Sequence, residues 1–390
     1  MEVKRGIKVR TGGFKRALLS ILTVASLMAL AISLLSVSPS SAAPEGLTPR
    51  APISIDGNAG FTAVNGVVAG SGTAGDPYII EGWGINAREA NGIGIKDTSA
   101  HFIIRNCSVH GVGTYVGIYF YNVKNGKIKN VVSNNNFHGI HFYDSSNNLI
   151  QNCISENNVG KGIWLWYSPN NLIENCIARN NNYEDIHLWN SDNNCVENCT
   201  FESNDHGVTI YSSKNNVITN CAIRTNNFGV YIQSSNSNVV TDCIIENNNF
   251  GITIVSTSNN NLITNCTLKN NNLGSKISDS SDNNRIYHNN FMSNTRQAID
   301  YCTNYWDNGY PSGGNYWSNY TGEDIDNDGI GDTPYSILGG MNRDLYPFIN
   351  PVKMTEPSLI SSHLKILLVM VVMAITAICI GAAAIYARRR

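Results

Sequence analysis

A repeat of 22 or 23 residues runs through most of this chain and restricts its possible folds more than any other feature. Each copy begins with the pattern Gly-Ile-x-Leu/Phe-x, in which x varies. The copies start at Gly117, Gly139, Gly162, Asp185, Gly207, Gly229 and Gly251, with weaker ones at Gly92, Gly274 and Gln297. One unit is too small to bury its own apolar side chains, whereas stacked units bury them against each other. The repeat therefore predicts a solenoid.

A second motif, Asn-Leu/Val-Ile/Val-x-Asn-Cys, keeps step with the first. It starts at Asn148, Asn171, Asn194, Asn216 and Asn261, with variants at Phe102 and Asn238. Each unit thus holds about three short segments in which apolar and variable residues alternate, and no helical period is present. We predict an all-β fold, a right-handed parallel β-helix of about nine to ten coils. Strands ~4.8 Å apart make this a rod of roughly 45 Å.

The second asparagine of this motif forms a column of equivalent residues. Its members are Asn106, Asn130, Asn152, Asn175, Asn198, Asn220 and Asn265, with Asp242 on one rung. Each lies between two strands, and asparagine tolerates the left-handed backbone that a corner requires. We expect these residues to hold the corners and to bond their amides from coil to coil.

The next residue forms a cysteine column. Its members are Cys107, Cys153, Cys176, Cys199, Cys221, Cys243 and Cys266, with Val131 on one rung. Disulfides are common in exported proteins, but in-register stacking at ~4.8 Å exceeds the ~3.5–4.5 Å that disulfide Cβ atoms need. A metal thiolate ladder would bury negative charge. We interpret the column as small apolar core residues.

The variable positions of the Gly-Ile-x-Leu/Phe-x segments are aromatic over about five coils. Because Ile118 and Phe120 are expected to point inward, the alternate residues point outward. The resulting stripe comprises Tyr119, Tyr121, His141, Tyr143, Trp164, Trp166, His187, Trp189, Tyr211 and Tyr231. Cross-strand packing alone explains some aromatic residues on a sheet. A patch this large is also typical of a binding surface, and we predict that it binds a polysaccharide.

Both ends of the chain are hydrophobic. A basic start, an apolar run and a small-residue site predict a secretory signal peptide cleaved after Ala42, or an uncleaved anchor. The run from Ile366 has the length of a membrane span and precedes three arginines, so the preceding part is expected outside the cell. The expected parts are 1–42 signal peptide, 43–90 N-terminal cap and first strands, 91–303 β-helix repeats, 304–350 C-terminal cap, 351–365 tether, 366–387 transmembrane helix and 388–390 cytoplasmic tail.

Three segments resemble a known family, the carbohydrate-binding and sugar-hydrolase β-helix repeats, and most closely the NosD-like proteins. They are PISIDGNAGF from Pro52, GSGTAGDPYIIEGWGI from Gly70 and NYWSNYTGEDIDNDGIGDTPY from Asn315. The resemblance covers about residues 52–347 and implies the right-handed β-helix fold. It also implies a role in copper-site assembly, but the sequence has no methionine-rich tract or paired His/Met spacing from which copper ligands could be named.

The closing segment suggests a calcium site. Asp324, Asp326, Asp328 and Asp332, with Gly329, have the spacing of a calcium loop, although Tyr335 stands where an EF-hand has glutamate. An acidic surface turn is the alternative. The sequon at Asn319 is the best glycan acceptor, since the sequons at Asn106, Asn198 and Asn265 fall in the expected asparagine column.

The function expected from these patterns is a non-catalytic, membrane-anchored surface module that binds carbohydrate or mediates adhesion. One alternative is a glycoside hydrolase or polysaccharide lyase that uses Glu184, Asp185 and Asp205. Ion pairing across coils would explain the same residues without catalysis. Others are a copper-accessory protein and a structural spacer of the cell envelope. A net charge of -2, with no basic surface expected on the β-helix, argues against nucleic acid.

Overall fold

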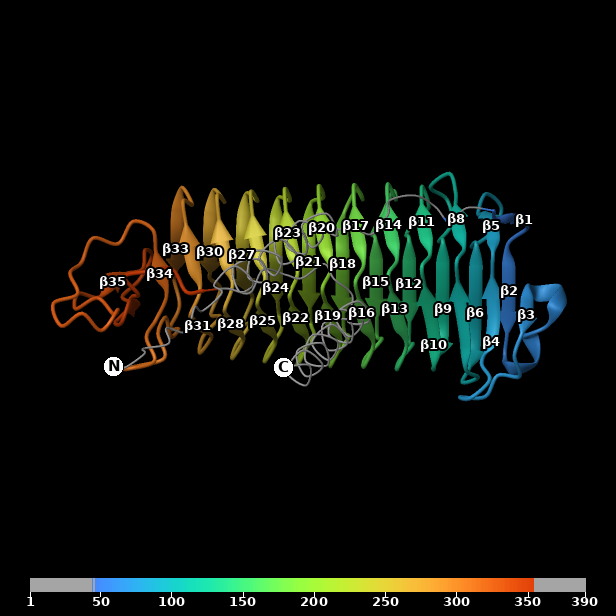
Figure 1. Ribbon diagram of the computed structural model, residues 1–390, viewed down its shortest axis with the longest axis horizontal. Helices are drawn as coiled ribbons and strands as arrows, with labels where there is room; N and C mark the ends of the chain where they lie inside the picture. Colours follow the sequence, from blue (N-terminus) through green and yellow to red (C-terminus); the bar gives the residue numbers. More distant parts are fainter. Residues whose placement is uncertain (1–43, 45, 354–390) are drawn as a thin grey trace, which may run out of the picture. The chain divides into compact units, whose positions relative to one another are not determined.

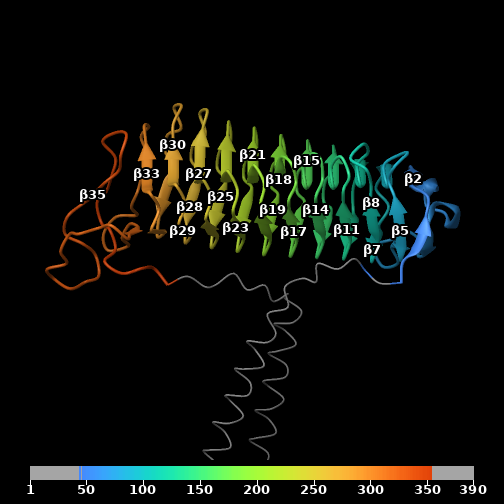
Figure 2. The ribbon, with the colours of Figure 1, turned by 90° about the horizontal axis from the view of Figure 1, so that it is seen from above.

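Each repeat forms one coil of a parallel β-helix, as the computed structural model of the chain shows (Figure 1). The structure describes residues 44 and 46–353, in which about ten turns stack along one axis. Figure 2 shows the same stack turned by 90°. The predicted all-β solenoid is therefore confirmed. No helix in this described part is both long and apolar enough for a membrane span. The expected signal peptide, most of the tether, the transmembrane helix and the tail lie outside it.

Every coil places one strand in each of three long sheets. Sheet 1 contains β1 (Thr48–Arg50), β5 (Trp83–Asn86), β8 (Ser108–His110), β11 (Val132–Asn134), β14 (Ile154–Glu156), β17 (Ile177–Arg179), β20 (Thr200–Glu202), β23 (Ala222–Arg224), β26 (Ile244–Glu246), β29 (Thr267–Lys269), β32 (Asn290–Met292) and β34 (Tyr316–Trp317). Sheet 2 contains β3 (Val67–Ala69), β4 (Tyr78–Glu81), β7 (Phe102–Arg105), β10 (Gly126–Lys129), β13 (Leu149–Gln151), β16 (Leu172–Glu174), β19 (Cys195–Glu197), β22 (Val217–Thr219), β25 (Val239–Thr241), β28 (Leu262–Thr264) and β31 (Arg285–Tyr287).

Sheet 3 is built from the Gly-Ile-x-Leu/Phe-x segments. It contains β2 (Ile53–Asp56), β6 (Ile93–Thr98), β9 (Ile118–Val123), β12 (Ile140–Tyr143), β15 (Ile163–Trp166), β18 (Glu184–Trp189), β21 (His206–Tyr211), β24 (Phe228–Gln233), β27 (Phe250–Val255), β30 (Leu273–Ile277) and β33 (Arg296–Asp300). Outside the sheets lie the 3-10 turns Asn58–Gly60 and Ala63–Asn65 and the hairpin of β35 (Tyr335–Ser336) and β36 (Arg343–Asp344). Strands β1 to β5 already belong to the three sheets, so coiling begins within residues 43–90.

The core is a column of inward side chains from all three sheets. In one coil Ile163 and Leu165 come from sheet 3, Ile173 from sheet 2 and Ala178 from sheet 1, and all are fully buried. The glycine that opens the sheet 3 strands is required by close packing: at Gly139 an added Cβ would lie 1.9 Å from Ser155 Oγ. Stacking repeats therefore buries a continuous apolar core that a single repeat cannot form.

The predicted asparagine corners are confirmed, but their amides do not form the expected long ladder. Asn152, Asn175 and Asn220 all have φ near +50°, the left-handed region. Coil-to-coil amide bonds in this column join only Asn130 to Asn106 (3.3 Å) and Asn152 to Asn130 (3.2 Å) among the described residues. The other asparagines of the column are half-buried and form no amide bond from coil to coil among the described residues.

The buried ladders use other residues of the repeat. The first asparagine of the second motif supplies one: Asn194 N donates to Asn216 Oδ1 at 2.8 Å, and Asn216 N donates to Asn238 Oδ1 at 2.9 Å. Its members are Asn148, Asn171, Asn194, Asn216, Asn238, Asn261, Asn284 and Asn304. A second runs through Asn136, Asn158, Asn181, Asn204, Asn226, Asn248, Asn271 and Asn294. These ladders give partners to backbone N–H groups at corners, where no strand can pair them.

The cysteine column lies in the core, as predicted. Its seven members are at most 1% exposed and free. The Cys153 thiol donates to the Gln151 carbonyl at 3.2 Å. Burial raises the pKa of the Cys107 thiol to about 11, so it behaves as a small apolar group.

Aromatic rings close the C-terminal end of the core. Trp317 stacks on Phe291 at 4.3 Å and on Tyr335 at 4.2 Å between ring centroids. Trp317 Nε1 donates to the buried Asp344 carboxylate at 2.8 Å. Burial raises the pKa of Asp344 to about 7. The cap thus covers the last apolar coil and satisfies the polar atoms that it buries.

Candidate functional site

The outward face of sheet 3 carries the predicted aromatic residues in register. One column passes through Tyr119, His141, Trp164 and His187. The neighbouring column passes through Tyr121, Tyr143, Trp166, Trp189 and Tyr211. Parallel pairing brings these side chains together from five coils, although they are spread over more than ninety residues of sequence.

The second column is a continuous row of touching rings. Centroid distances are 5.5 Å for Tyr121–Tyr143, 4.9 Å for Tyr143–Trp166, 5.1 Å for Trp166–Trp189 and 5.5 Å for Trp189–Tyr211. All five residues are partly exposed. They form an aromatic platform that follows the axis of the β-helix.

The histidines of the first column are buried, not exposed as expected. His141 and His187 are each 8% exposed. His141 stacks on Trp164 at 4.2 Å, and His187 lies 5.9 Å from Trp189. Neighbouring rings on a flat sheet cover these shorter side chains, an effect that residue parity does not reveal. Burial lowers the pKa of His141 to about 3, so its imidazole is neutral near pH 7.

A polar cluster borders this column, and two of its members, His138 and Lys161, were not among the predicted site residues. His138, in the turn before β12, accepts a hydrogen bond at Nδ1 from Lys161 N (2.9 Å) and meets Trp164 edge-on at 5.0 Å. Lys161 forms an ion pair with Glu184 and lies 5.5 Å above the Trp164 ring. The sequence shows the pair of histidines as HGIH, with His138 in the turn and His141 in the strand that follows.

Glu184 joins the cluster to His187. Its Oε1 lies 3.2 Å from His187 Nδ1, within ion-pair distance but without hydrogen-bond geometry. Burial alone would raise the pKa of Glu184, but His187 and Lys161 together lower it to about 2. The carboxylate is therefore ionised and already paired.

The other two carboxylates of the hydrolase or lyase alternative do not share this site. Asp185 points into the solenoid and is fully buried, where it accepts hydrogen bonds from Asn181 (2.9 Å) and Asn204. Asp205 is exposed and lies 3.5 Å from His206 Nδ1. Glu184 pairs with Lys161 and His187 on the outer face, whereas Asp185 bonds inside the solenoid, so the two carboxylates cannot act on one bond.

Unpaired buried polar atoms gather on this face. Among the described residues, eleven buried side-chain polar atoms have no hydrogen-bond partner. Eight of them belong to the outward face of sheet 3: His141 Nε2, Trp164 Nε1, Trp166 Nε1, both ring nitrogens of His187, His206 Nδ1, Thr209 Oγ1 and Thr253 Oγ1. Each such atom costs about 1–3 kcal/mol. Such atoms call for an explanation, and their concentration at one place makes this face the candidate site.

Tyr231 lies beyond the main platform, in a second aromatic group. His206, Phe228 and Tyr231 meet with centroids about 5 Å apart, and Phe228 stacks on Phe250 at 4.8 Å. The phenylalanines occupy the first position of their strands, which was not included in the predicted stripe. The aromatic surface therefore continues over β21, β24 and β27.

The acidic loop of the cap brings three of its four predicted ligands together. Ligand oxygens of Asp324, Asp326 and Asp328 lie within 4.8 Å of one another. Asp332 instead accepts a hydrogen bond from Ile325 N at 2.7 Å. The hard oxygen donors suit calcium.

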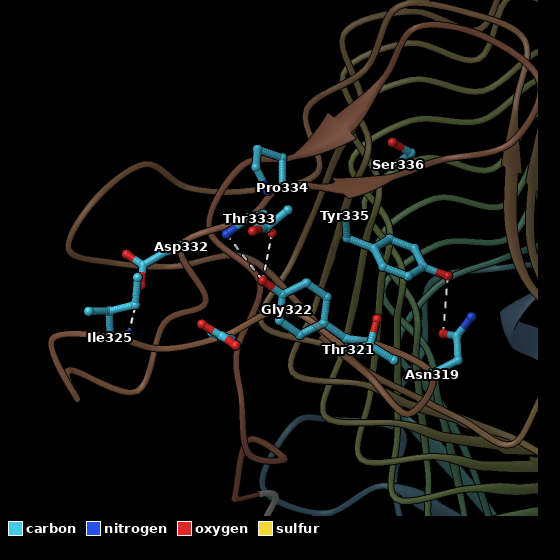
Figure 3. Close-up of a pocket in the computed structure, with 11 residues that line it drawn as sticks. Asn319, Thr321, Gly322, Ile325, Asp332, Thr333, Pro334, Tyr335 and Ser336 are labelled. Carbon is cyan, nitrogen blue, oxygen red and sulfur yellow. Dashed lines mark hydrogen bonds between the residues drawn. The ribbon is translucent and has the colours of Figure 1, made fainter.

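A pocket beside this loop contains the predicted glycan acceptor (Figure 3). Asn319 is exposed, and its Oδ1 accepts a hydrogen bond from Tyr335 at 3.1 Å. Tyr320 forms part of the lining and donates to the Thr333 carbonyl at 2.6 Å.

The architecture defines the class of the protein as a parallel β-solenoid with an aromatic outer face. Its sequence matches the profile of the family described as "Periplasmic copper-binding protein (NosD)" over residues 55–242 and 161–322. These matches span more than half of the chain, which therefore belongs to the NosD family. A comparison with curated protein sequences finds no match.

Two solved structures are similar to this chain at low identity. The A-module of Azotobacter vinelandii mannuronan C-5 epimerase AlgE4 is 13% identical, with a TM-score of 0.44, over 69% of this chain and 85% of that one. Geobacillus virus E2 ORF18 is 14% identical, with a TM-score of 0.48, over 63% of this chain and 56% of that one. Similarity this distant says nothing about the activity of this chain.

Proposed function

We propose that this protein is a non-catalytic carbohydrate-binding module, displayed outside the cell, whose aromatic platform holds a polysaccharide. The concentration of unpaired buried polar atoms on sheet 3 supports this best. Sugars have apolar C–H faces that stack on aromatic rings, and hydroxyl groups that can pair with indole and imidazole nitrogens. Coils repeat every ~4.8 Å and alternate residues along a strand lie about 6.6–7 Å apart, which suits sugar rings.

Copper binding, which the family description includes, fits the described residues poorly. The Nδ1 lone pair of His138 is occupied by Lys161 N–H. His141 and His187 flank Trp164, with ring centroids 4.2 and 6.3 Å from the indole, so they cannot share an ion. Within residues 44 and 46–353, the only three-residue ligand cluster is the acidic loop, whose oxygens suit calcium or magnesium better than copper.

Retention on immobilised polysaccharides tests the proposal. The double variant Trp164→Ala/Trp166→Ala should lose retention on a binding polysaccharide and still fold, because both side chains point away from the core. The matched control is Tyr301→Ala. It removes an aromatic ring that is 61% exposed and lies after β33, away from the aromatic platform. Unchanged retention by the double variant, or cleavage of the polysaccharide by the parent protein, would contradict the non-catalytic module.

A further inference from the structure

The unpaired polar atoms and the charges on sheet 3 restrict the class of carbohydrate that this face can bind. Trp164 and Trp166 each present an indole N–H, which can only donate a hydrogen bond. His141 and His187 present unpaired imidazole nitrogens, and a neutral imidazole has one donor and one acceptor. The matching ligand must both donate and accept at close intervals.

The tautomer of His187 is set by its neighbour. Nδ1 faces the ionised Glu184 carboxylate at 3.2 Å, which favours the proton on Nδ1. Nε2 is then an acceptor, buried and unpaired. A sugar hydroxyl can donate to it, whereas a carboxylate, which only accepts, cannot.

Charge on the face also disfavours an acidic ligand. Strands β9, β12, β15, β18, β21 and β24 contribute one outward charged side chain, Glu184. The nearest cation, Lys161, is already paired with it, and Asp205 adds a further exposed negative charge. Lys96 of β6, in register with Tyr121, pairs with Asp56, and Lys276 of β30 lies two coils beyond Tyr231. Over β9 to β24 a uronate carboxylate would therefore meet repulsion and no unpaired cation.

We infer that the platform selects neutral, hydroxyl-rich polysaccharides and discriminates against their uronate counterparts. This inference rests on the proposed carbohydrate-binding function and names its ligand class. The unpaired nitrogens lie beneath neighbouring rings, so binding requires the Trp166 ring to turn aside from Trp189 and Trp164, its stacking partners at 5.1 and 5.2 Å.

Matched pairs of oligosaccharides test the inference, because their members share linkage and stereochemistry and differ only at C6. Mannohexaose with mannuronate hexasaccharide, and the galactose and glucose equivalents, would be titrated against the full protein by calorimetry. The neutral member of a bound pair should bind at least ten-fold tighter, with little dependence on salt. Trp166→Phe keeps a stacking ring without the N–H and should weaken neutral binding about three- to ten-fold, whereas Tyr301→Phe should not.

The substitution Glu184→Gln removes the ion-pair partner of Lys161. It should improve uronate binding and so reduce the difference in affinity between the neutral and the acidic member of a pair. Tighter binding of the acidic member by the parent protein would overturn the inference and leave the carbohydrate-binding function standing. Failure to bind either member of every pair would overturn both. Melting temperatures of all variants establish that a lost signal is not unfolding.

Discussion

Two asparagines of one repeat should differ sharply in their contribution to stability. Asn216 and Asn220 belong to the same NVITNC segment, but Asn216 is fully buried in a ladder and Asn220 is a left-handed corner with φ +51°. Both would be replaced by alanine, and Asn220 also by glycine. The buried ladder residue should matter more than the corner residue.

The magnitude for Asn216→Ala follows from its partners. Its Oδ1 accepts from Asn194 N at 2.8 Å and from Asn194 Nδ2 at 3.2 Å. Alanine leaves that backbone N–H buried without a partner, which costs about 1–3 kcal/mol, and opens a small cavity at about 1 kcal/mol. We expect a loss of about 3 kcal/mol in the free energy of unfolding.

The corner substitutions provide the comparison. No side-chain hydrogen bond of Asn220 joins it to a described residue, so alanine there costs only the left-handed strain, about 1 kcal/mol. Glycine relieves that strain and should be close to neutral. Urea unfolding followed by circular dichroism measures all three. Equal losses for the two alanine variants would refute the assignment of the buried ladder to the first asparagine of the motif.

Three further predictions concern the core and the cap. Saturating calcium should stabilise the protein through Asp324, Asp326 and Asp328 by about 2.7 kcal/mol at a hundred times Kd; a melting curve that a chelator leaves unchanged would contradict this. The column cysteines Cys153 to Cys266 should alkylate as free thiols after denaturation, and mass spectrometry that finds disulfides among them would show the opposite. Burial raises the pKa of the Asp185 carboxyl group, so this group resists ionisation in the folded protein. The protonated carboxyl group therefore favours the folded state at low pH, and this contribution to stability is lost as pH rises from the unfolded pKa of about 4 through the folded pKa. Asp185→Asn should therefore gain melting temperature relative to the parent between pH 5 and pH 8, and parallel curves would exclude an ionising Asp185.

The repeat period and its alternation determined the solenoid, because each unit has to bury its apolar face against the next one. The same alternation placed Trp164, Trp166 and the tyrosines on the outward face, and the register of β12, β15 and β18 agrees. Left-handed corners at Asn152 and Asn175 followed from the conformational tolerance of asparagine. These features depend on local periodicity and on backbone preference, and both can be read from one amino-acid sequence.

Only the tertiary structure decided what each polar residue contacts. Both asparagines of a motif look alike in sequence, yet the first bonds inside the solenoid and the second lies half-buried at the surface, because the turn between sheets sets the direction of each side chain. His141 and His187 share outward parity with Trp164, but larger neighbouring rings bury them. The pairing of Lys161 with Glu184 joins residues from adjacent coils. Such contacts arise when the coils stack, and the spacing along one repeat does not contain them.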